Sequence, residues 1–162
     1  MQAVLKQVNV SDGGMPKHSV LKAHVTANGL VGDRQRNLKY HGGPKRAVCI
    51  YSEELYEWLR DLLERELPLG SIGENFTTAG LDLGGLKPGD RVRVGGCVIE
   101  ITGVRVPCNQ LKKWDPDLPE LIVGRSGWVA KVIEEGIVGP GDSITLLATA
   151  PEPAPASPVV DG

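Results

Sequence analysis

The chain has 162 residues, which is enough for one domain with a hydrophobic core of its own. Its formal net charge is −2, so no overall positive field draws it to nucleic acid or to an anionic membrane surface. It has no apolar run of 18 residues, no signal-peptide pattern and no close-spaced cysteine pair, so we expect a cytoplasmic protein without a transmembrane helix, a disulfide framework or a Cys-only zinc site.

The chain contains 21 glycines and only 4% aromatic residues, a composition typical of β-rich domains with many tight turns. Runs of β-branched or alternating apolar residues predict strands at 2–10, 20–26, 47–51, 91–94, 97–102, 128–133 and 144–147. Because about seven to nine short strands recur at regular spacing, we expect a mainly β fold, a closed or nearly closed β-barrel with inserted loops, over residues 1–149. Residues 150–162 are rich in proline and alanine, and we expect them to form a disordered, extended tail.

One long helix is predicted after the third strand. Ser52 is a good N-cap, and the acidic residues that follow it suit the first turn of a helix. Leucines then recur at helical spacing, which predicts a core-facing side made of Leu55, Leu59, Leu62 and Leu63. We expect this helix to run to about Glu66, because Pro68 cannot continue it.

Cys108 stands where the strand pattern of residues 98–102 ends. Pro107 has no amide proton, so the strand ladder is expected to stop at or near Cys108. Polar and cationic neighbours such as Arg105 and Lys112 favour a thiolate over a thiol, and a thiolate is a soft-metal ligand and a sulfur nucleophile. The other interpretation is a buried, inert cysteine, and the residues alone leave both open.

The other two cysteines are expected to be structural. Cys49 lies in the continuous apolar run 47–51, which predicts a strand buried on both faces and places Cys49 in the core. Cys97 alternates with Ile99 and Ile101, which indicates that it packs with them.

Four polar clusters contain glycines, which let a backbone approach a ligand closely. They are residues 32–35, 41–43, 73–75 and 124–127. Their amides, together with Arg34, Lys45, Arg46, Arg105 or Arg125, are suited to binding a phosphate, although for each cluster alone an ordinary turn with a solvated charge is the favoured interpretation. His41 is either an acid–base group or a hydrogen-bonding partner of its turn.

Several short motifs together carry a family resemblance. They lie at residues 13–17 (GGMPK), 29–35 (GLVGDRQ), 41–44 (HGGP), 47–51 (AVCIY), 73–75 (GEN), 88–90 (PGD), 107–108 (PC) and 141–142 (GD). In this order and spacing they resemble the MOSC domain, named for the C-terminal domain of molybdenum-cofactor sulfurases, in its bacterial stand-alone branch. The resemblance extends from about Val8 to Leu147.

This resemblance implies a β-barrel of the MOSC type, which is similar to the pyruvate-kinase barrel, and a cysteine that ligates molybdenum or carries sulfur as a persulfide. Cys108 is the residue that matches this cysteine. The residues implied to line the pocket for the pterin and its phosphate are Asp33, Gln35, His41, Gly42, Gly43, Glu74, Asn75, Arg105 and Arg125.

Three functions follow as expectations. The first is a small molybdenum-cofactor oxidoreductase that reduces N-hydroxylated small molecules and needs an external electron donor, since the chain shows no cysteine cluster or appended reductase module. The second is a carrier that receives sulfur on Cys108 from a cysteine desulfurase. The third is a β-barrel that binds another ligand, with Cys108 merely structural.

Overall fold

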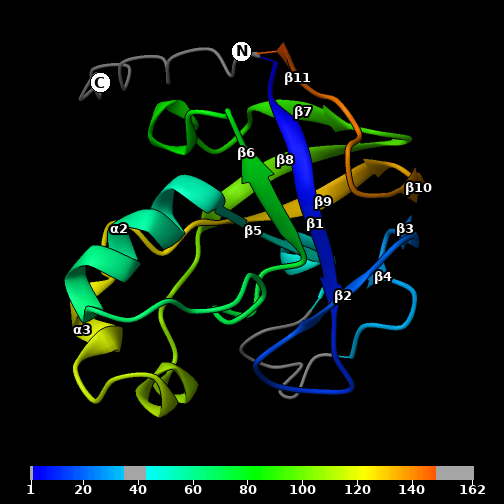
Figure 1. The fold of residues 1–162 in the computed structure, drawn as a ribbon. Coiled ribbons are helices and arrows are strands. Elements are labelled where there is room, and N and C mark those ends of the chain that lie inside the picture. The colour runs from blue at the N-terminus through cyan, green and yellow to red at the C-terminus, as the bar shows by residue number, and fades with distance from the viewer. Residues whose placement is uncertain (1, 35–42, 149–162) are drawn as a thin grey trace, which may run out of the picture.

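The structure is a computed structural model, and it describes residues 2–34 and 43–148. Most strands belong to one eight-stranded sheet with the order β11-β7-β8-β9-β5-β6-β1-β2 (Figure 1). Its members are β1 (Val4–Val10), β2 (His18–Val20), β5 (Val48–Ser52), β6 (Phe76–Ala79), β7 (Arg91–Val94), β8 (Cys97–Val104), β9 (Trp128–Glu134) and β11 (Ile144–Ala148). Neighbouring strands are antiparallel except β5 and β6, which are parallel.

A second sheet has three short antiparallel strands in the order β10-β3-β4. They are β3 (Ala23–Thr26), β4 (Gly29–Leu30) and β10 (Gly136–Val138). The sequence predicted a single strand over residues 20–26. The chain instead breaks at Leu21, which is 89% exposed, and β2 and β3 join different sheets.

The expected mainly β class is therefore confirmed, and the strands form two sheets. The pairing among the described strands contains no closed barrel. Backbone hydrogen bonds nevertheless link the chain around the start of β1 to the chain around the start of β11: the amide of Leu5 donates to the carbonyl of Asp142, and the amide of Ile144 donates to the carbonyl of Ala3.

The long predicted helix is α2 (Glu53–Leu63), and its N-cap is confirmed because the Leu55 amide donates to Ser52 Oγ at 3.1 Å. It ends earlier than expected, at Glu64, which adopts a left-handed conformation with φ 53°. Leu59 is buried as predicted, whereas Leu62 is 42% exposed. The remaining helices are short: η1 (Pro44–Arg46), η2 (Leu83–Gly85), η3 (Asn109–Lys113) and α3 (Leu118–Leu121).

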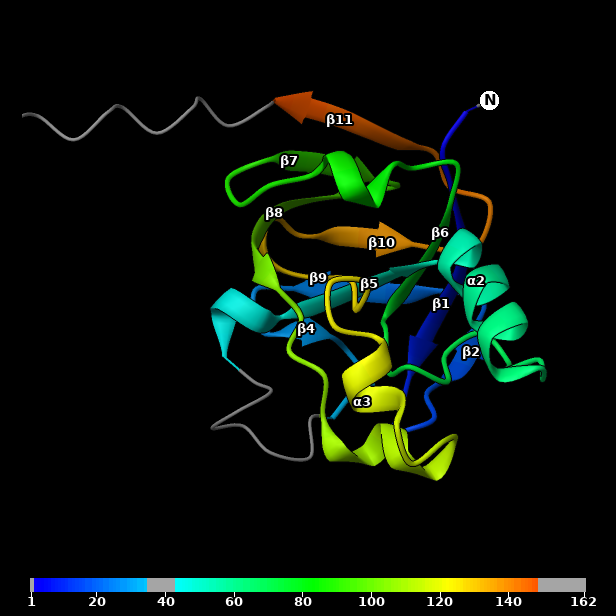
Figure 2. The same ribbon diagram turned by 90° about the vertical axis from the view of Figure 1, so that its left-hand side faces the viewer.

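The buried apolar residues form two clusters. The first lies within and between the sheets, and includes Val48, Ile50 and Cys97. The second joins α2 to the segment that follows Cys108; its buried members are Tyr51, Tyr56, Leu59, Leu67, Ile72, Leu111, Leu118 and Ile122. This second cluster fixes η3 and α3 at the end of the molecule opposite β7 and β11 (Figure 2).

No helix in the described part of the chain is long and apolar enough to span a membrane. The tail that the sequence predicts from residue 150 lies outside the described residues, as does the end of the predicted 1–149 domain.

Candidate functional site

A cavity of about 300 Å³ lies beside the ends of β5, β8 and β9 and is the centre of the candidate site. Its walls come from the loop between β1 and β2, from β5, from the turn before β6 and from the segment that leaves β8. The lining residues are Gly14, Met15, Lys17, Arg34, Arg46, Cys49, Gly73, Asn75, Val104, Arg105, Val106, Pro107, Cys108, Gln110 and Val129.

Cys108 is a half-buried member of this lining. The strand β8 ends at Val104, so Cys108 lies farther from the ladder than the sequence suggested, in extended backbone just before η3. The η3 segment is tied to the β1–β2 loop, because Gln110 Oε1 accepts from the Met15 amide at 3.1 Å and Lys113 Nζ donates to the Met15 carbonyl. These bonds hold the Cys108 segment beside the β1–β2 loop.

Arg105 enters the cavity from the same segment. Its amide donates to the Gly127 carbonyl at 3.0 Å, and its carbonyl accepts from Ser126 Oγ at 2.5 Å. The side-chain atom Nη1 is buried and has no hydrogen-bond partner in the protein. A buried charged donor without an acceptor is costly, so this atom fits an oxygen atom of a bound ligand or water.

Gly73 gives the arginine its room. A Cβ atom at Gly73 would lie 3.1 Å from Arg105 Nη2 and 3.1 Å from Met15 Cε. Its φ of 91° also disfavours any other residue. The glycine that the sequence singled out therefore maintains the space around the guanidinium.

Asp33 lies behind the lining of the cavity and accepts hydrogen bonds from two lining residues. Its oxygen atoms accept from Lys17 Nζ at 2.6 and 2.8 Å, and Oδ2 accepts from Asn75 Nδ2 at 2.9 Å. The ion pair is nearly buried, with side-chain exposures of 10% for Lys17 and 4% for Asp33. Asp33 therefore orients Lys17 and Asn75 and does not itself line the cavity.

Asn75 in turn holds Cys49. The backbone amide of Cys49 donates to Asn75 Oδ1 at 2.9 Å, and the backbone amide of Asn75 donates to the Cys49 carbonyl at 2.8 Å. The prediction that Cys49 is a core residue was wrong, because Cys49 is half-buried and lines the cavity. Burial raises the pKa of its thiol, and the positive charge of Arg105 acts in the opposite direction.

Glu74 lies away from the cavity although it precedes Asn75. Its carboxylate is fully buried and accepts from Tyr56 Oη at 2.7 Å, from Thr77 Oγ1 at 2.7 Å and from the Gly70 amide at 3.2 Å. Burial raises the pKa of this carboxyl, and the bonds from Thr77 and Tyr56 lower it. Glu74 therefore stabilises the turn behind the cavity and is not among the lining residues.

The other predicted site residues lie elsewhere or outside the described chain. Arg125 is exposed and stacks on Trp58, 4.7 Å from the ring centroid. Gly43 is an exposed residue before η1 and does not line the cavity. Gln35, His41 and Gly42 lie outside the described residues.

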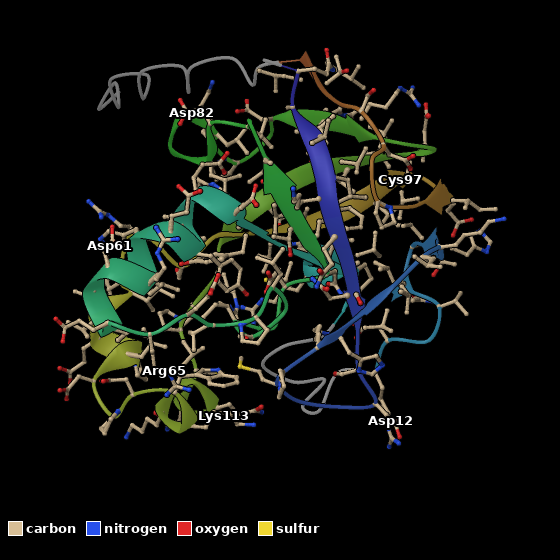
Figure 3. All side chains as sticks on the ribbon, viewed as in Figure 1. Asp12, Asp61, Arg65, Asp82, Cys97 and Lys113 are labelled. Atoms are coloured by element: carbon tan, nitrogen blue, oxygen red, sulfur yellow. The ribbon has the colours of Figure 1, made fainter. Side chains whose placement is uncertain are left out.

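The prediction that Cys97 is structural is confirmed, because Cys97 is fully buried in the first core cluster. Burial raises the pKa of its thiol to about 12. Figure 3 shows it beside β10, far from Lys113 on η3.

Sequence reasoning missed Lys17 and the apolar part of the lining, including Met15, Val104 and Val106. The signal available for Lys17 was the motif GGMPK, which had no assigned chemistry.

The cavity is chemically distinctive. Four cationic side chains, Lys17, Arg34, Arg46 and Arg105, belong to its described lining, and no carboxylate does. Two thiols, Cys49 and Cys108, join them. The described residues contain no group of three or more His, Cys, Asp or Glu side chains suited to a metal ion, so the arrangement fits an anionic group bound beside a soft sulfur ligand better than a bare ion.

Comparison with known proteins agrees with this arrangement. The family model of the MOSC domain matches residues 37–145, which is more than half of the chain. The chain belongs to the MOSC domain family. Its motifs and its fold group it with bacterial MOSC proteins similar to YiiM and YflK.

Three relatives define this similarity. The uncharacterized protein YflK of Bacillus subtilis is 37% identical over 122 residues, 72% of this chain and 55% of that protein. YiiM of Escherichia coli is 37% identical over 76% of this chain and 58% of its own length. The superposition on the crystal structure of E. coli YiiM covers 93% of this MOSC chain and 71% of the YiiM chain, with a TM-score of 0.73 and 28% sequence identity. A protein of Gibberella moniliformis named reductase is 34% identical over 75% of this chain and 23% of its own length.

The chain thus spans just over half the length of the two bacterial relatives.

Proposed function

We propose that this MOSC protein binds the molybdenum cofactor and acts as a reductase of N-hydroxylated small molecules, with Cys108 as the protein ligand of the metal. The observation that carries the proposal is the position of Cys108 in a cavity whose described lining is cationic and free of carboxylates. A thiolate suits molybdenum, and cationic side chains suit the phosphate of the pterin.

The residues present fit such a group. Arg105 Nη1 is a buried donor without a protein acceptor, and Gly73 keeps space beside Nη2 of the same guanidinium. Arg34 and Arg46 lie on exposed parts of the chain, where they can reach a phosphate. When bound, the cofactor supplies the redox-active metal for a two-electron reduction.

The protein's own residues bind and orient. Arg105 would hold an anionic oxygen, Cys108 would hold the metal, and the Asp33–Lys17 pair would keep one wall rigid. The exposed apolar side chains Val104 and Val106 would contact the apolar part of a substrate and exclude water there. An external donor would supply the electrons. The Gibberella relative, of which this chain covers 23%, is named reductase, which supports a reductive role.

A sulfur carrier is the second candidate. The half-buried Cys108 thiol, with cations around it, is also suited to hold a persulfide received from a cysteine desulfurase. A cytoplasmic location suits either function.

The hydrogen bonds between the chain around the start of β1 and residues 142–144 support a nearly closed barrel as the finer description of the fold.

The experiment is elemental analysis for molybdenum, with intact mass, on wild-type protein and Cys108→Ser from a host that makes the cofactor. We expect molybdenum near one per chain in the wild type and background levels in the variant. A sulfur adduct on Cys108 without metal would favour the carrier. Equal molybdenum in both proteins would exclude Cys108 as the ligand.

A further inference from the structure

Cys49 is a second thiol in the cavity, and the proposed function does not use it. On β5 its neighbours Val48 and Ile50 are buried in the first core cluster, so strand alternation turns Cys49 to the other face, where the cavity lies. The two hydrogen bonds between Cys49 and Asn75 fix the backbone at this point. The thiol therefore has a defined position in the same cavity as Cys108.

Reduction of an N-hydroxyl group needs protons as well as electrons. The reaction R–NHOH + 2 e⁻ + 2 H⁺ gives R–NH₂ and water, and the oxygen must be protonated as the N–O bond breaks. Among the described lining residues the ionisable groups other than arginines are Lys17, Cys49 and Cys108. Within this described part of the lining, one of these three groups would supply the proton.

Two of the three are already engaged. Lys17 donates to both oxygens of the Asp33 carboxylate, and loss of its proton would leave that nearly buried carboxylate without its counter-ion. Cys108 is the proposed metal ligand and binds as a thiolate. Among the lining residues that the structure describes, Cys49 is then the remaining group that carries a transferable proton.

We propose that Cys49 is the proton donor of the reaction and passes its thiol proton to the substrate oxygen as the N–O bond breaks. The inference rests on the proposed function. The S–H bond of Cys49 breaks, and an O–H bond of the departing water forms. The external donor supplies both electrons, solvent supplies the proton for nitrogen, and the Cys49 thiolate then regains a proton from solvent.

The charged surroundings of Cys49 agree with this role. Burial raises the pKa of the thiol, so the proton is present before the reaction. The charges that act on it come from four segments: Arg105 and Lys17 favour the thiolate, whereas Glu74 and Asp33 oppose it. Arg105 has the largest influence of these charges, and it would stabilise the thiolate that remains after proton transfer.

The kinetic test uses Cys49→Ala and Cys49→Ser, loaded with cofactor, with N-phenylhydroxylamine as substrate and a reduced viologen dye as electron donor. We expect kcat for aniline formation to fall about 100-fold in Cys49→Ala, within the range for loss of a general acid, at unchanged molybdenum content. Cys49→Ser is expected to recover part of kcat, because its hydroxyl also donates a proton. The alkaline decline of wild-type kcat, caused by loss of the thiol proton, should disappear in Cys49→Ala.

The matched control is Cys97→Ala, which removes a buried thiol of the first core cluster and should leave kcat within about twofold. A Cys49→Ala protein with molybdenum and wild-type kcat would overturn the proposal.

A second test needs no loaded enzyme. In metal-free Cys108→Ser, iodoacetamide should alkylate Cys49 and spare Cys97, which is fully buried. The rate should rise with pH toward a midpoint above that of an ordinary cysteine. A Cys49 that does not react in the folded protein, or that reacts with a lower midpoint, would contradict the inference.

The two proposals fail in different ways. Absence of molybdenum and of reductase activity in the wild type would reject the proposed function and this inference with it. A molybdenum-containing, active wild type together with a fully active Cys49→Ala would reject the proton donor alone.

Discussion

Glu74 and Asn75 are neighbours in the chain, yet they belong to two polar regions with opposite properties. Around Glu74 every carboxylate oxygen has a protein donor, from Tyr56, Thr77 or Gly70. Asn75 instead lines the cavity together with Arg105, whose buried atom Nη1 has no protein partner. The Glu74 carboxylate is fully hydrogen-bonded and stabilises the fold, whereas the cavity lining includes a charged side chain with an unused donor and is suited to a ligand.

Lys17 shares properties of both regions. It lines the cavity, yet its ammonium group is bound by the Asp33 carboxylate. Substitutions in the two regions should therefore separate effects on stability from effects on ligand binding, with Lys17 as the residue where stability dominates.

The largest effect on stability is expected for Lys17→Met. This variant leaves the Asp33 carboxylate, with 4% side-chain exposure, without its counter-ion, so the free energy of unfolding should fall by about 3 kcal/mol. Denaturant titration measures this change. Lys6→Met is the control, because the Lys6–Glu53 pair is 3.7 Å apart and largely exposed, and it should cost about 0.5 kcal/mol or less. Equal losses in the two variants would show that the Asp33 pair is no stronger than a surface pair.

A smaller effect, of a different kind, is expected for Arg105→Ala. Because Nη1 has no protein partner to lose, the free energy of unfolding should change by about 1 kcal/mol or less. Loss of a charged hydrogen bond to the cofactor should weaken its retention about tenfold, measured as molybdenum per chain after dialysis. Arg93→Ala, a surface variant next to Glu134, should retain the wild-type content. Unaltered retention in Arg105→Ala would remove Arg105 from the binding site.

The smallest effect is expected for Glu74→Gln, which should change how the free energy of unfolding depends on pH. Burial raises the pKa of Glu74 in the folded protein, so the folded state binds this proton more tightly than the unfolded state does. Its contribution to stability is therefore full below the ordinary carboxyl pKa and is lost as pH rises through the raised value. Glu74→Gln has no such proton, and the decline of its unfolding free energy over this range should be shallower than in the wild type.

Denaturant titrations from pH 4 to 8 measure this difference, and Glu57→Gln, an exposed residue of α2, is the control. Identical slopes in wild type and Glu74→Gln would mean that the folded protein does not alter the affinity of Glu74 for its proton.

Local sequence patterns predicted much of the secondary structure. The Ser52 cap, the start of α2 and the strands β7 and β8 all appear where expected, because caps and apolar alternation act over a few residues. The very short strands β4 and β10 were missed, since two or three residues carry no periodic signal and are held by pairing to β3.

The candidate site was only partly predictable. Cys108, Arg105 and Asn75 were expected from their residue types and from the family resemblance, and the structure brings them to one cavity. Cys49 was assigned to the core because an apolar run resembles a strand buried on both faces. The assignment was wrong because only the packing of β5 against β6 and β9 shows which face meets the cavity.

The sequence by itself determined the mainly β class, the long helix α2, the MOSC family motifs and the choice of Cys108 as the candidate thiol. Those properties depend on residue type and short-range spacing. The tertiary structure decided which polar residues face the cavity and which stabilise the fold. Glu74 and Asn75 show why: adjacent residues point to different environments, and each has at least one hydrogen-bond partner more than 15 residues away in the chain.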